Sequence, residues 1–299
     1  MANICNFLRT YKQIGIMTLE RKVDFAIKLL RSIPTNDGPI ELSYSGGKDS
    51  DVILELTRMS GIPFEAIYKN TTIDPPGTIP HCKEQGVTIL KPKLTFLQLV
   101  ERKGTPSRFA RFCCEELKEY KVYNRAIQGI RRCESTARAK RYHEPEICRV
   151  YSAKEKVRVY LPILEWTDED VLRFIEDRGI KCAPTYYDEN GVFHVERRLG
   201  CIGCPLASDN GRADFLKYPK LLKQIIEAKK RFYATHPNAG KTFDRNVYNG
   251  LYYQFFCRNL EDYRVAIGGV YSRNRQSTRN GFYLTISESN YNTLIQYSL

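Results

Sequence analysis

The feature that most constrains this chain is a glycine pair that directly follows a short apolar segment. Residues 40–44 have the composition of a buried strand, and the glycines stand in the run Ser45-Gly46-Gly47-Lys48-Asp49-Ser50. Residues 49–60 then carry apolar side chains at helical spacing, and Gly61 and Pro63 close the segment. Residues 64–68 form the next predicted strand. This order of strand, loop, helix and strand predicts a parallel α/β sheet.

The chemistry of the loop indicates a phosphate site. A glycine pair at such a turn lets backbone N–H groups approach a phosphate, and the following helix presents its positive N-terminal end. Ser45 and Ser50 add hydroxyl donors, Lys48 adds a cation, and Asp49 is a candidate for capping the helix or holding magnesium. The spacing differs from the Walker loop, which has four residues between its glycines. A plain tight turn is the alternative, but the complete hexapeptide at this place favours a phosphate site.

The later segments continue the alternation of strands and helices. Strands are predicted at 87–90, 126–130 and 157–161, and helices at 18–30, 96–102, 115–126, 167–178 and 216–233. Thr167 is expected to cap its helix, whose first turn is acidic. We expect an α/β fold: a mostly parallel twisted sheet with helices on both faces, plus a mainly helical C-terminal extension. The expected divisions are an N-terminal helical segment (1–35), a nucleotide-binding domain (36–206) and the extension (207–299).

The charge balance and the lack of long apolar runs limit the classes of partner. A formal charge of +13 favours nucleotides, nucleic acids or acidic surfaces without choosing among them, and solvated basic faces are the alternative. No run approaches the roughly 18 apolar residues of a membrane span, and no apolar leader opens the chain. We therefore expect a cytoplasmic protein without a membrane partner. The four histidines show no ligand spacing, and His81 is expected on the surface.

Cysteine usage points to metal or redox chemistry. Ten cysteines in a chain expected in the cytoplasm favour metal binding or catalysis over a disulfide framework. Four of them form two pairs, Cys113-Cys114 and Cys201-x-x-Cys204. Four thiolates from two distant pairs suit a [4Fe–4S] cluster or a zinc ion, and unligated buried thiols are the remaining interpretation. Most other cysteines are expected to be small buried side chains, but Cys133 lies among arginines and is a candidate low-pKa thiol.

Several stretches, in chain order, carry a resemblance to a known family. SYSGGKDSDVIL at 43–54 resembles the pyrophosphate loop of the adenine-nucleotide alpha-hydrolase superfamily, in the branch of the phosphoadenosine phosphosulfate (PAPS) reductases. NTTIDPP at 70–76, GIRRCES at 129–135 and LPILEWTDEDV at 161–171 resemble three further segments of that branch. The CC…CxxC arrangement resembles the iron–sulfur type of adenylyl sulfate reductase. Together the matches cover most of residues 40–206.

The resemblance implies a nucleotide at the carboxyl ends of the strands. The implied nucleotide-binding residues are Ser43, Ser45, Gly46, Gly47, Lys48, Asp49, Ser50, Asn70, Thr71, Asp74, Gly129, Arg131, Glu134 and Ser135. The implied catalytic residues are Lys48, Asp49, Arg131 and Arg138. The two arginines would bind phosphate or sulfate oxygens, and a solvated basic helix face is the alternative. The implied ligands of a [4Fe–4S] cluster are Cys113, Cys114, Cys201 and Cys204.

Three functions are compatible with this resemblance. An ATP pyrophosphatase would bind ATP with Mg²⁺, transfer AMP to an acceptor oxygen and release pyrophosphate, after which sulfur would displace AMP. Here the motifs are most similar to the ATP-pyrophosphatase component of DNA phosphorothioation systems, which implies a nucleic-acid substrate and a sulfur-donor protein such as a cysteine desulfurase.

A PAPS or adenylyl sulfate reductase would instead release sulfite from its nucleotide substrate, and those enzymes use a cysteine near the C-terminus. The end of this sequence contains no such cysteine, while its nucleotide loop is intact. We therefore favour the ATP pyrophosphatase. The third interpretation is a non-catalytic protein that binds nucleotide and nucleic acid, which the basic segment Arg273–Arg279 and its neighbouring tyrosines would support.

Overall fold

The computed structural model describes residues 17–36, 38–108, 110–152, 155–207, 209, 211–241 and 245–256. Residue contacts divide the chain into two compact units. Unit 1 comprises Met1–Asn70, Pro75–Pro92 and Lys118–Leu199, and unit 2 comprises Thr71–Asp74, Lys93–Leu117 and Gly200–Leu299. Each unit draws on separate stretches of sequence, and the divisions expected at residues 35 and 206 stay predictions. The basic segment Arg273–Arg279 lies outside the described residues.

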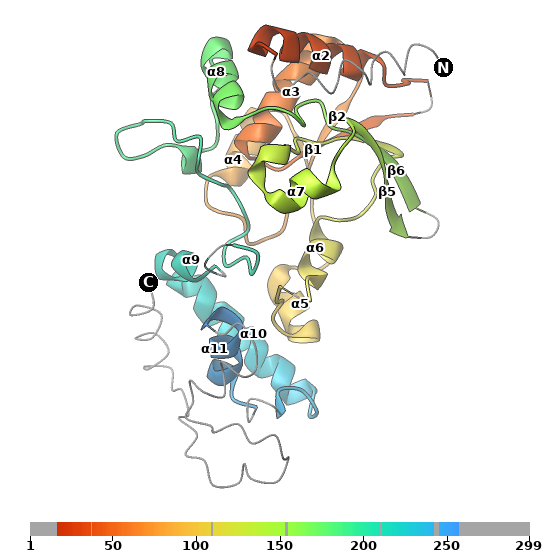
Figure 1. Ribbon diagram of the computed structural model, residues 1–299. Helices are drawn as coiled ribbons and strands as arrows, with labels where there is room; N and C mark the ends of the chain where they lie inside the picture. Colours follow the sequence, from red (N-terminus) through yellow and green to blue (C-terminus); the bar gives the residue numbers. More distant parts are fainter. Residues whose placement is uncertain are drawn as a thin grey trace. The chain divides into compact units, whose positions relative to one another are not determined.

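Unit 1 is built on a sheet whose described strands run in the order β3-β2-β1-β4-β6-β5. Figure 1 labels β1, β2, β5 and β6 of this sheet. The strands are β1 (Ile40–Tyr44), β2 (Glu65–Lys69), β3 (Thr88–Leu90), β4 (Arg125–Ile127), β5 (Glu146–Ser152) and β6 (Glu155–Tyr160). The pairs from β3 to β6 are parallel, and β5 runs antiparallel to β6 at the edge. Ile40 and Leu42 of β1 are completely buried, as expected for a central strand. The predicted α/β fold with a mostly parallel sheet is confirmed.

The helices of unit 1 include α2 (Leu19–Arg31), α3 (Lys48–Ser60), α4 (Thr78–Glu84), α7 (Thr136–Arg141) and α8 (Asp168–Arg178), with short 3₁₀ helices η2 (Arg132–Glu134) and η3 (Pro184–Tyr186). Helix α3 packs against β1, α2 and α8. Helix α8 begins at the predicted cap, because Thr167 Oγ1 accepts the Asp170 N–H at 3.2 Å and Asp170 accepts the Thr167 N–H at 2.7 Å. This cap fixes where the chain after Trp166 enters the helix.

Two local predictions are wrong because of contacts distant in sequence, and one strand was missed. The helix predicted at 115–126 ends at Leu117, and the chain then runs toward β4. Lys69 Nζ donates to the carbonyl of Tyr120 at 2.7 Å, so tertiary contacts override the helical pattern there. Strand β5 was not predicted. His81 is buried rather than on the surface, with Nε2 at 2.9 Å from Asp51 Oδ1.

Unit 2 is helical in its described part. It contains α5 (Phe96–Lys103), α6 (Phe112–Leu117), α9 (Arg212–Lys217), α10 (Pro219–Thr235) and α11 (Val247–Phe256). Helix α10 packs against α5, α9 and α11, and Leu99, Val100, Ile225, Ile226 and Leu251 are among its core residues. The helical character expected for the extension is therefore confirmed for the described residues. In those same residues, no helix combines the length and apolarity needed to cross a membrane.

Candidate active site

The predicted phosphate loop joins β1 to α3. Gly46 has φ +77°, and a Cβ at that position would lie 2.9 Å from Thr78 Cγ2, so the backbone conformation and the close packing both require glycine. Gly47 is the N-cap residue of α3, with φ −87° and ψ 159°, and as a glycine it supplies no side-chain cap. The start of α3 therefore lacks a cap from its own N-cap residue and has the positively polarised form that binds anions when a ligand is present.

The side chains of the loop support its turn and place a cation beside it. Ser50 Oγ donates to the carbonyl of Gly47 at 2.6 Å, and Ser45 Oγ lies 3.3 Å from Ser50 Oγ. Lys48 is buried, and its Nζ donates to Asp49 Oδ2 at 3.2 Å. The loop thus brings hydroxyl groups and an ammonium group together at one end of α3.

The loop forms part of a pocket of about 230 Å³ within unit 1. The lining residues that were predicted from the sequence are Ser43, Ser45, Gly47, Lys48, Asp49, Ser50, Gly129, Glu134 and Arg138. Gly129 packs tightly on the loop, because a Cβ there would lie 2.8 Å from the carbonyl oxygen of Asp49. Three lining residues were missed by sequence reasoning, namely Tyr186, Arg198 and Leu199. All the lining residues belong to unit 1, so the pocket is complete within one compact body.

Tyr186 closes one side of the loop. Its phenol oxygen is hydrogen bonded to the backbone N–H groups of Lys48 and Leu199, and its ring lies 5.6 Å from Lys48 Nζ. Burial is the main cause that raises the pKa of Tyr186 above its ordinary value, so the phenol stays protonated at neutral pH. If a phosphate oxygen accepted a hydrogen bond from the Lys48 N–H, it would displace the phenol oxygen of Tyr186 from that N–H.

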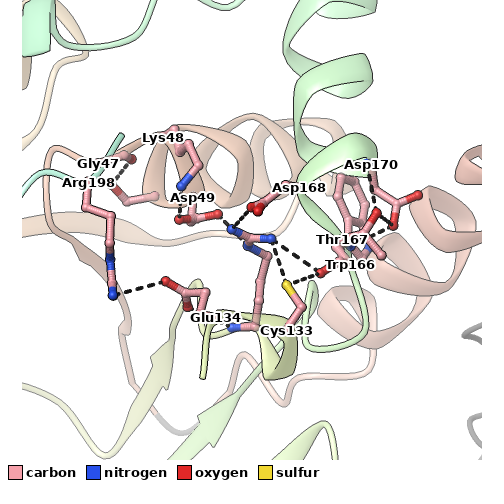
Figure 2. Close-up of polar contacts among 12 residues, drawn as sticks. Gly47, Lys48, Asp49, Cys133, Glu134, Trp166, Thr167, Asp168, Asp170 and Arg198 are labelled. Carbon is pink, nitrogen blue, oxygen red and sulfur yellow. Dashed lines mark hydrogen bonds and ion pairs between the residues drawn. The ribbon is translucent and has the colours of Figure 1, made fainter. Parts of the chain in front are cut away.

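Arg131 is buried and pairs with two carboxylates (Figure 2). Its side chain is 1% exposed, its Nε donates to Asp49 Oδ1 at 2.6 Å, and its Nη2 donates to Asp168 Oδ1 at 2.8 Å. Burial alone would lower the pKa of Arg131, but the two carboxylates outweigh it and the pKa is raised. Arg131 does not line the pocket. Its guanidinium ties the loop to the start of α8, and its role in anion binding stays a prediction.

Cys133 lies against the same guanidinium. Its Sγ accepts from Arg131 Nη1 at 3.0 Å and donates to the carbonyl of Trp166 at 3.2 Å, and these contacts are drawn in Figure 2. Burial raises the pKa of Cys133 even though the charge of Arg131 opposes the change. The low-pKa thiol considered from the sequence is therefore not what this structure shows.

Glu134 joins two arginines on the pocket wall. One of its carboxylate oxygens pairs with Arg138. The other lies 3.5 Å from Arg198 Nη2, and Figure 2 shows this second contact. Burial, and then the nearby charge of Arg198, lower the pKa of Arg138. Ser135 caps α7, with Oγ accepting the Arg138 N–H at 3.2 Å. The double arginine at 197 and 198 was the available sequence signal for Arg198, but only the fold shows which of the two faces the pocket.

Six predicted nucleotide-binding residues do not line the pocket, namely Gly46, Asn70, Thr71, Asp74, Arg131 and Ser135. The N–H of Asn70 donates to the carbonyl of Leu90 at 3.1 Å, which continues the pairing of β2 with β3 in unit 1. Thr71 and Asp74 belong to unit 2, where Asp74 Oδ2 accepts the Thr71 N–H at 3.1 Å. Their roles in nucleotide binding stay predictions.

All four predicted metal-ligand cysteines belong to unit 2. A hydrogen bond with Cys114 and burial raise the pKa of Cys113, and the fields of Cys201 and Cys204 act in the same direction. The other three cysteines thus act on the Cys113 thiol, and an all-thiol donor set has the soft character that suits a thiolate-bound metal centre.

The CxxC turn is tightly packed. The N–H of Gly203 donates to Asp214 Oδ2 at 2.8 Å, and a Cβ on Gly203 would lie 2.1 Å from the ring of Phe215. Over the described part of the chain, however, no three cysteine, histidine or acidic side chains are arranged as a metal-binding group.

The sheet order, the uncapped loop and the cationic pocket define a nucleotide-binding α/β protein of the adenine-nucleotide alpha-hydrolase type. The family model described as phosphoadenosine phosphosulfate reductase domain matches residues 39–207. The chain belongs to this family.

Relatives of known sequence agree with this assignment. An uncharacterised protein of Methanocaldococcus jannaschii is 31% identical over 246 residues, which are 76% of this chain and 56% of that protein. Sulfate adenylyltransferase subunit 2 of Nocardia farcinica is 26% identical over 219 residues, 58% of this chain and 67% of the relative. This chain thus spans little more than half the length of the first of these relatives.

A solved FMN adenylyltransferase from Candida glabrata, in complex with FMN and an ATP analogue, is similar with a TM-score of 0.40 and 16% identity. The match covers 60% of this chain and 65% of that one.

Proposed function

We propose that the protein binds ATP in the unit 1 pocket, transfers the AMP moiety to an acceptor oxygen and releases pyrophosphate. The observation that carries this proposal is the pocket itself, in which the uncapped start of α3, Lys48 and the pair Glu134–Arg138 line one space. Backbone amides and Lys48 would stabilise the charge that develops on the departing pyrophosphate. Sulfate adenylyltransferase subunit 2 among the relatives supports an adenylyl transfer.

Magnesium would enter with the nucleotide. Both oxygens of Asp49 have cationic partners, Arg131 on Oδ1 and Lys48 on Oδ2, so a metal ion bound by Asp49 would share these oxygens with two cations. Mg²⁺ is commonly held by substrate phosphates, water and few protein oxygens. The residues around the loop therefore bind and orient the phosphates, and ATP supplies most of the ligands of its own metal ion.

The finer proposal is sulfur transfer. Cys113, Cys114, Cys201 and Cys204 would hold a [4Fe–4S] cluster, which would supply sulfur or electron chemistry when bound. The acceptor would then be a nucleic acid, and a cysteine desulfurase would donate the sulfur. The high positive charge of the chain and the placement of all four cysteines in unit 2 support this extension.

A second candidate is the reduction of PAPS or adenylyl sulfate with release of sulfite, which the family description favours. One anaerobic experiment separates the two. Mg–ATP is offered with inorganic sulfate or an oligonucleotide as acceptor, and PAPS is offered in parallel with thioredoxin. We expect pyrophosphate from ATP and its loss in Lys48→Ala. Sulfite from PAPS, without pyrophosphate from ATP under any condition, would replace our proposal by the reductase.

A further inference from the structure

Two carboxylates on the pocket wall each lie among cations, and this leaves the pocket positively charged. Asp49 has a cationic partner on each oxygen, and Glu134 lies between Arg138 and Arg198. The charged lining residues are Lys48, Arg138 and Arg198 against Asp49 and Glu134. A cleft with a surplus of positive charge attracts anions.

Arg198 has no evident role in holding the fold. Its side chain is 67% exposed, and its contact with Glu134 is long, at 3.5 Å. The neighbouring Arg197 has the structural role, because its Nη1 donates to the carbonyl of Tyr187 at 2.6 Å. Arg197 therefore fixes the segment after η3, and Arg198 extends from this segment toward Glu134 on the pocket wall (Figure 2).

The arginine pair is separate from the phosphate loop. The loop offers the start of α3 and the hydroxyl groups of Ser45 and Ser50, whereas Arg138 and Arg198 come from α7 and from the segment before Gly200. A guanidinium has five N–H donors, and one shared carboxylate leaves donors on both arginines for a second anion. Such forks match the oxygens of a tetrahedral oxyanion.

We propose that Arg198, together with Arg138, binds the oxyanion of the acceptor that attacks ATP, a sulfate-like or phosphodiester group. This inference rests on the proposed adenylyl transfer and names the substrate class of that site. It makes Arg198 a specificity-determining residue for the acceptor, while the loop binds the pyrophosphate of ATP. Arg138 and Arg198 would then share their N–H donors between Glu134 and the incoming anion.

The chemical step balances without any further reactant. A lone pair on an acceptor oxygen forms a bond to the α-phosphorus, and the bond from that phosphorus to the bridging oxygen of the β-phosphate breaks. Pyrophosphate leaves with the electron pair of that bond, and the acceptor carries AMP. An acceptor that is already an oxyanion needs no proton removed. Two arginines beside it would reduce its repulsion with the phosphates of ATP.

The test compares Arg198→Gln and Arg198→Lys with a matched control. Arg173→Gln removes the same charge from the same unit, at an exposed site on α8 where Arg173 pairs with Glu20 and Asp177. Isothermal titration measures binding of α,β-methylene-ATP first. It then measures inorganic sulfate and, separately, a short oligonucleotide, each with and without the nucleotide analogue.

We expect Arg198→Gln to weaken binding of the oxyanion at least tenfold and to change binding of the nucleotide analogue less than about twofold. Arg198→Lys should restore part of the lost oxyanion affinity. If the Arg198 substitution weakens binding of sulfate alone, the result would support an inorganic acceptor. If it weakens binding of the oligonucleotide alone, the result would support a phosphodiester. Unchanged binding of both, or an equal loss for the nucleotide analogue, would overturn the assignment. If the wild-type protein binds sulfate but no ATP analogue, the proposed function fails, and the assignment of Arg198 is still decided by the sulfate arm.

Discussion

The guanidinium of Arg131 donates to Asp49 at 2.6 Å, across 82 positions of sequence. This contact joins the first turn of α3 to the segment that follows β4, and the same guanidinium reaches Asp168 at the start of α8. The phosphate loop is thus anchored by the buried guanidinium of Arg131. Lys48 and the two arginines at 138 and 198 remain as the cations that line the pocket.

Removing Arg131 should destabilise the protein far more than removing its neighbour. Arg131→Met leaves the carboxylate of Asp49 without its buried partner, so we expect a loss of about 3–5 kcal/mol in the free energy of unfolding. Arg132→Met is the control, because Arg132 is 36% exposed and pairs with Glu165 near the surface, and should cost less than about 1 kcal/mol. Urea unfolding followed by circular dichroism measures both. Equal losses of unfolding free energy in the two variants would show that the contacts of Arg131 stabilise the protein no more than those of Arg132.

A methyl group at Gly129 should disturb the loop. In Gly129→Ala the new Cβ would meet the Asp49 carbonyl at 2.8 Å, so the start of α3 must shift. We expect ATP affinity to fall at least tenfold and stability to fall by about 1–3 kcal/mol. Gly200→Ala adds the same methyl where no atom lies within 4 Å and should change neither quantity. Normal ATP binding by Gly129→Ala would argue against close packing of these segments in solution.

Lys229 should make the stability of unit 2 depend on pH. Burial lowers the pKa of Lys229 to about 8, and its Nζ donates to Thr105 at 2.7 Å. The folded state therefore binds fewer protons than the unfolded state between about pH 8 and 10.5, and stability gains from Lys229 as pH rises through that window.

Lys229→Met removes the free-energy cost of burying a charged amine, which corresponds to roughly 3 kcal/mol below pH 8. We expect the variant to be more stable than wild type at pH 7, with the difference shrinking toward pH 10, in thermal unfolding. Lys223→Met, at an exposed position of the same helix, provides the control. A difference between Lys229→Met and wild type that stays constant from pH 7 to 10 would contradict a neutralised amine.

The four thiols of unit 2 should determine the iron content. Anaerobically purified protein is expected to contain about four iron atoms per chain and to show the broad visible absorption of an iron–sulfur cluster. The double substitution Cys201→Ser with Cys204→Ser should abolish both signals, while Cys148→Ser, at an exposed position of β5, should leave them intact. One zinc ion per chain, or no metal, would remove the cluster from our proposal.

The central strand and the phosphate loop could be predicted because the information is local. An apolar strand, two glycines and an amphipathic helix need no partner to be recognised, and the Thr167 cap of α8 was predicted for the same reason. The helix predicted after Leu117 failed because Lys69 and Glu65 contact residues 118–124 from another part of the chain. Local propensity contains no information on such contacts.

The candidate site was predicted in its residue types more than in its contacts. Gly129, Glu134 and Arg138 line the pocket as expected. Arg131 has the expected charge but pairs with carboxylates behind the loop, because burial is a property of the fold. Arg198 was missed because the sequence does not distinguish two adjacent arginines. The structure does, since among the described residues Arg197 donates to a backbone carbonyl and Arg198 does not.

Identifying which bond of ATP is broken tests the central claim most directly. ATP labelled at the γ-phosphate is incubated with Mg²⁺, the protein and each candidate acceptor, and the labelled product is identified by chromatography. Adenylyl transfer predicts label in pyrophosphate and AMP on the acceptor, with both products lost in Lys48→Ala. Label in orthophosphate with formation of ADP would contradict the account, because it would place the cleavage between the β- and γ-phosphates.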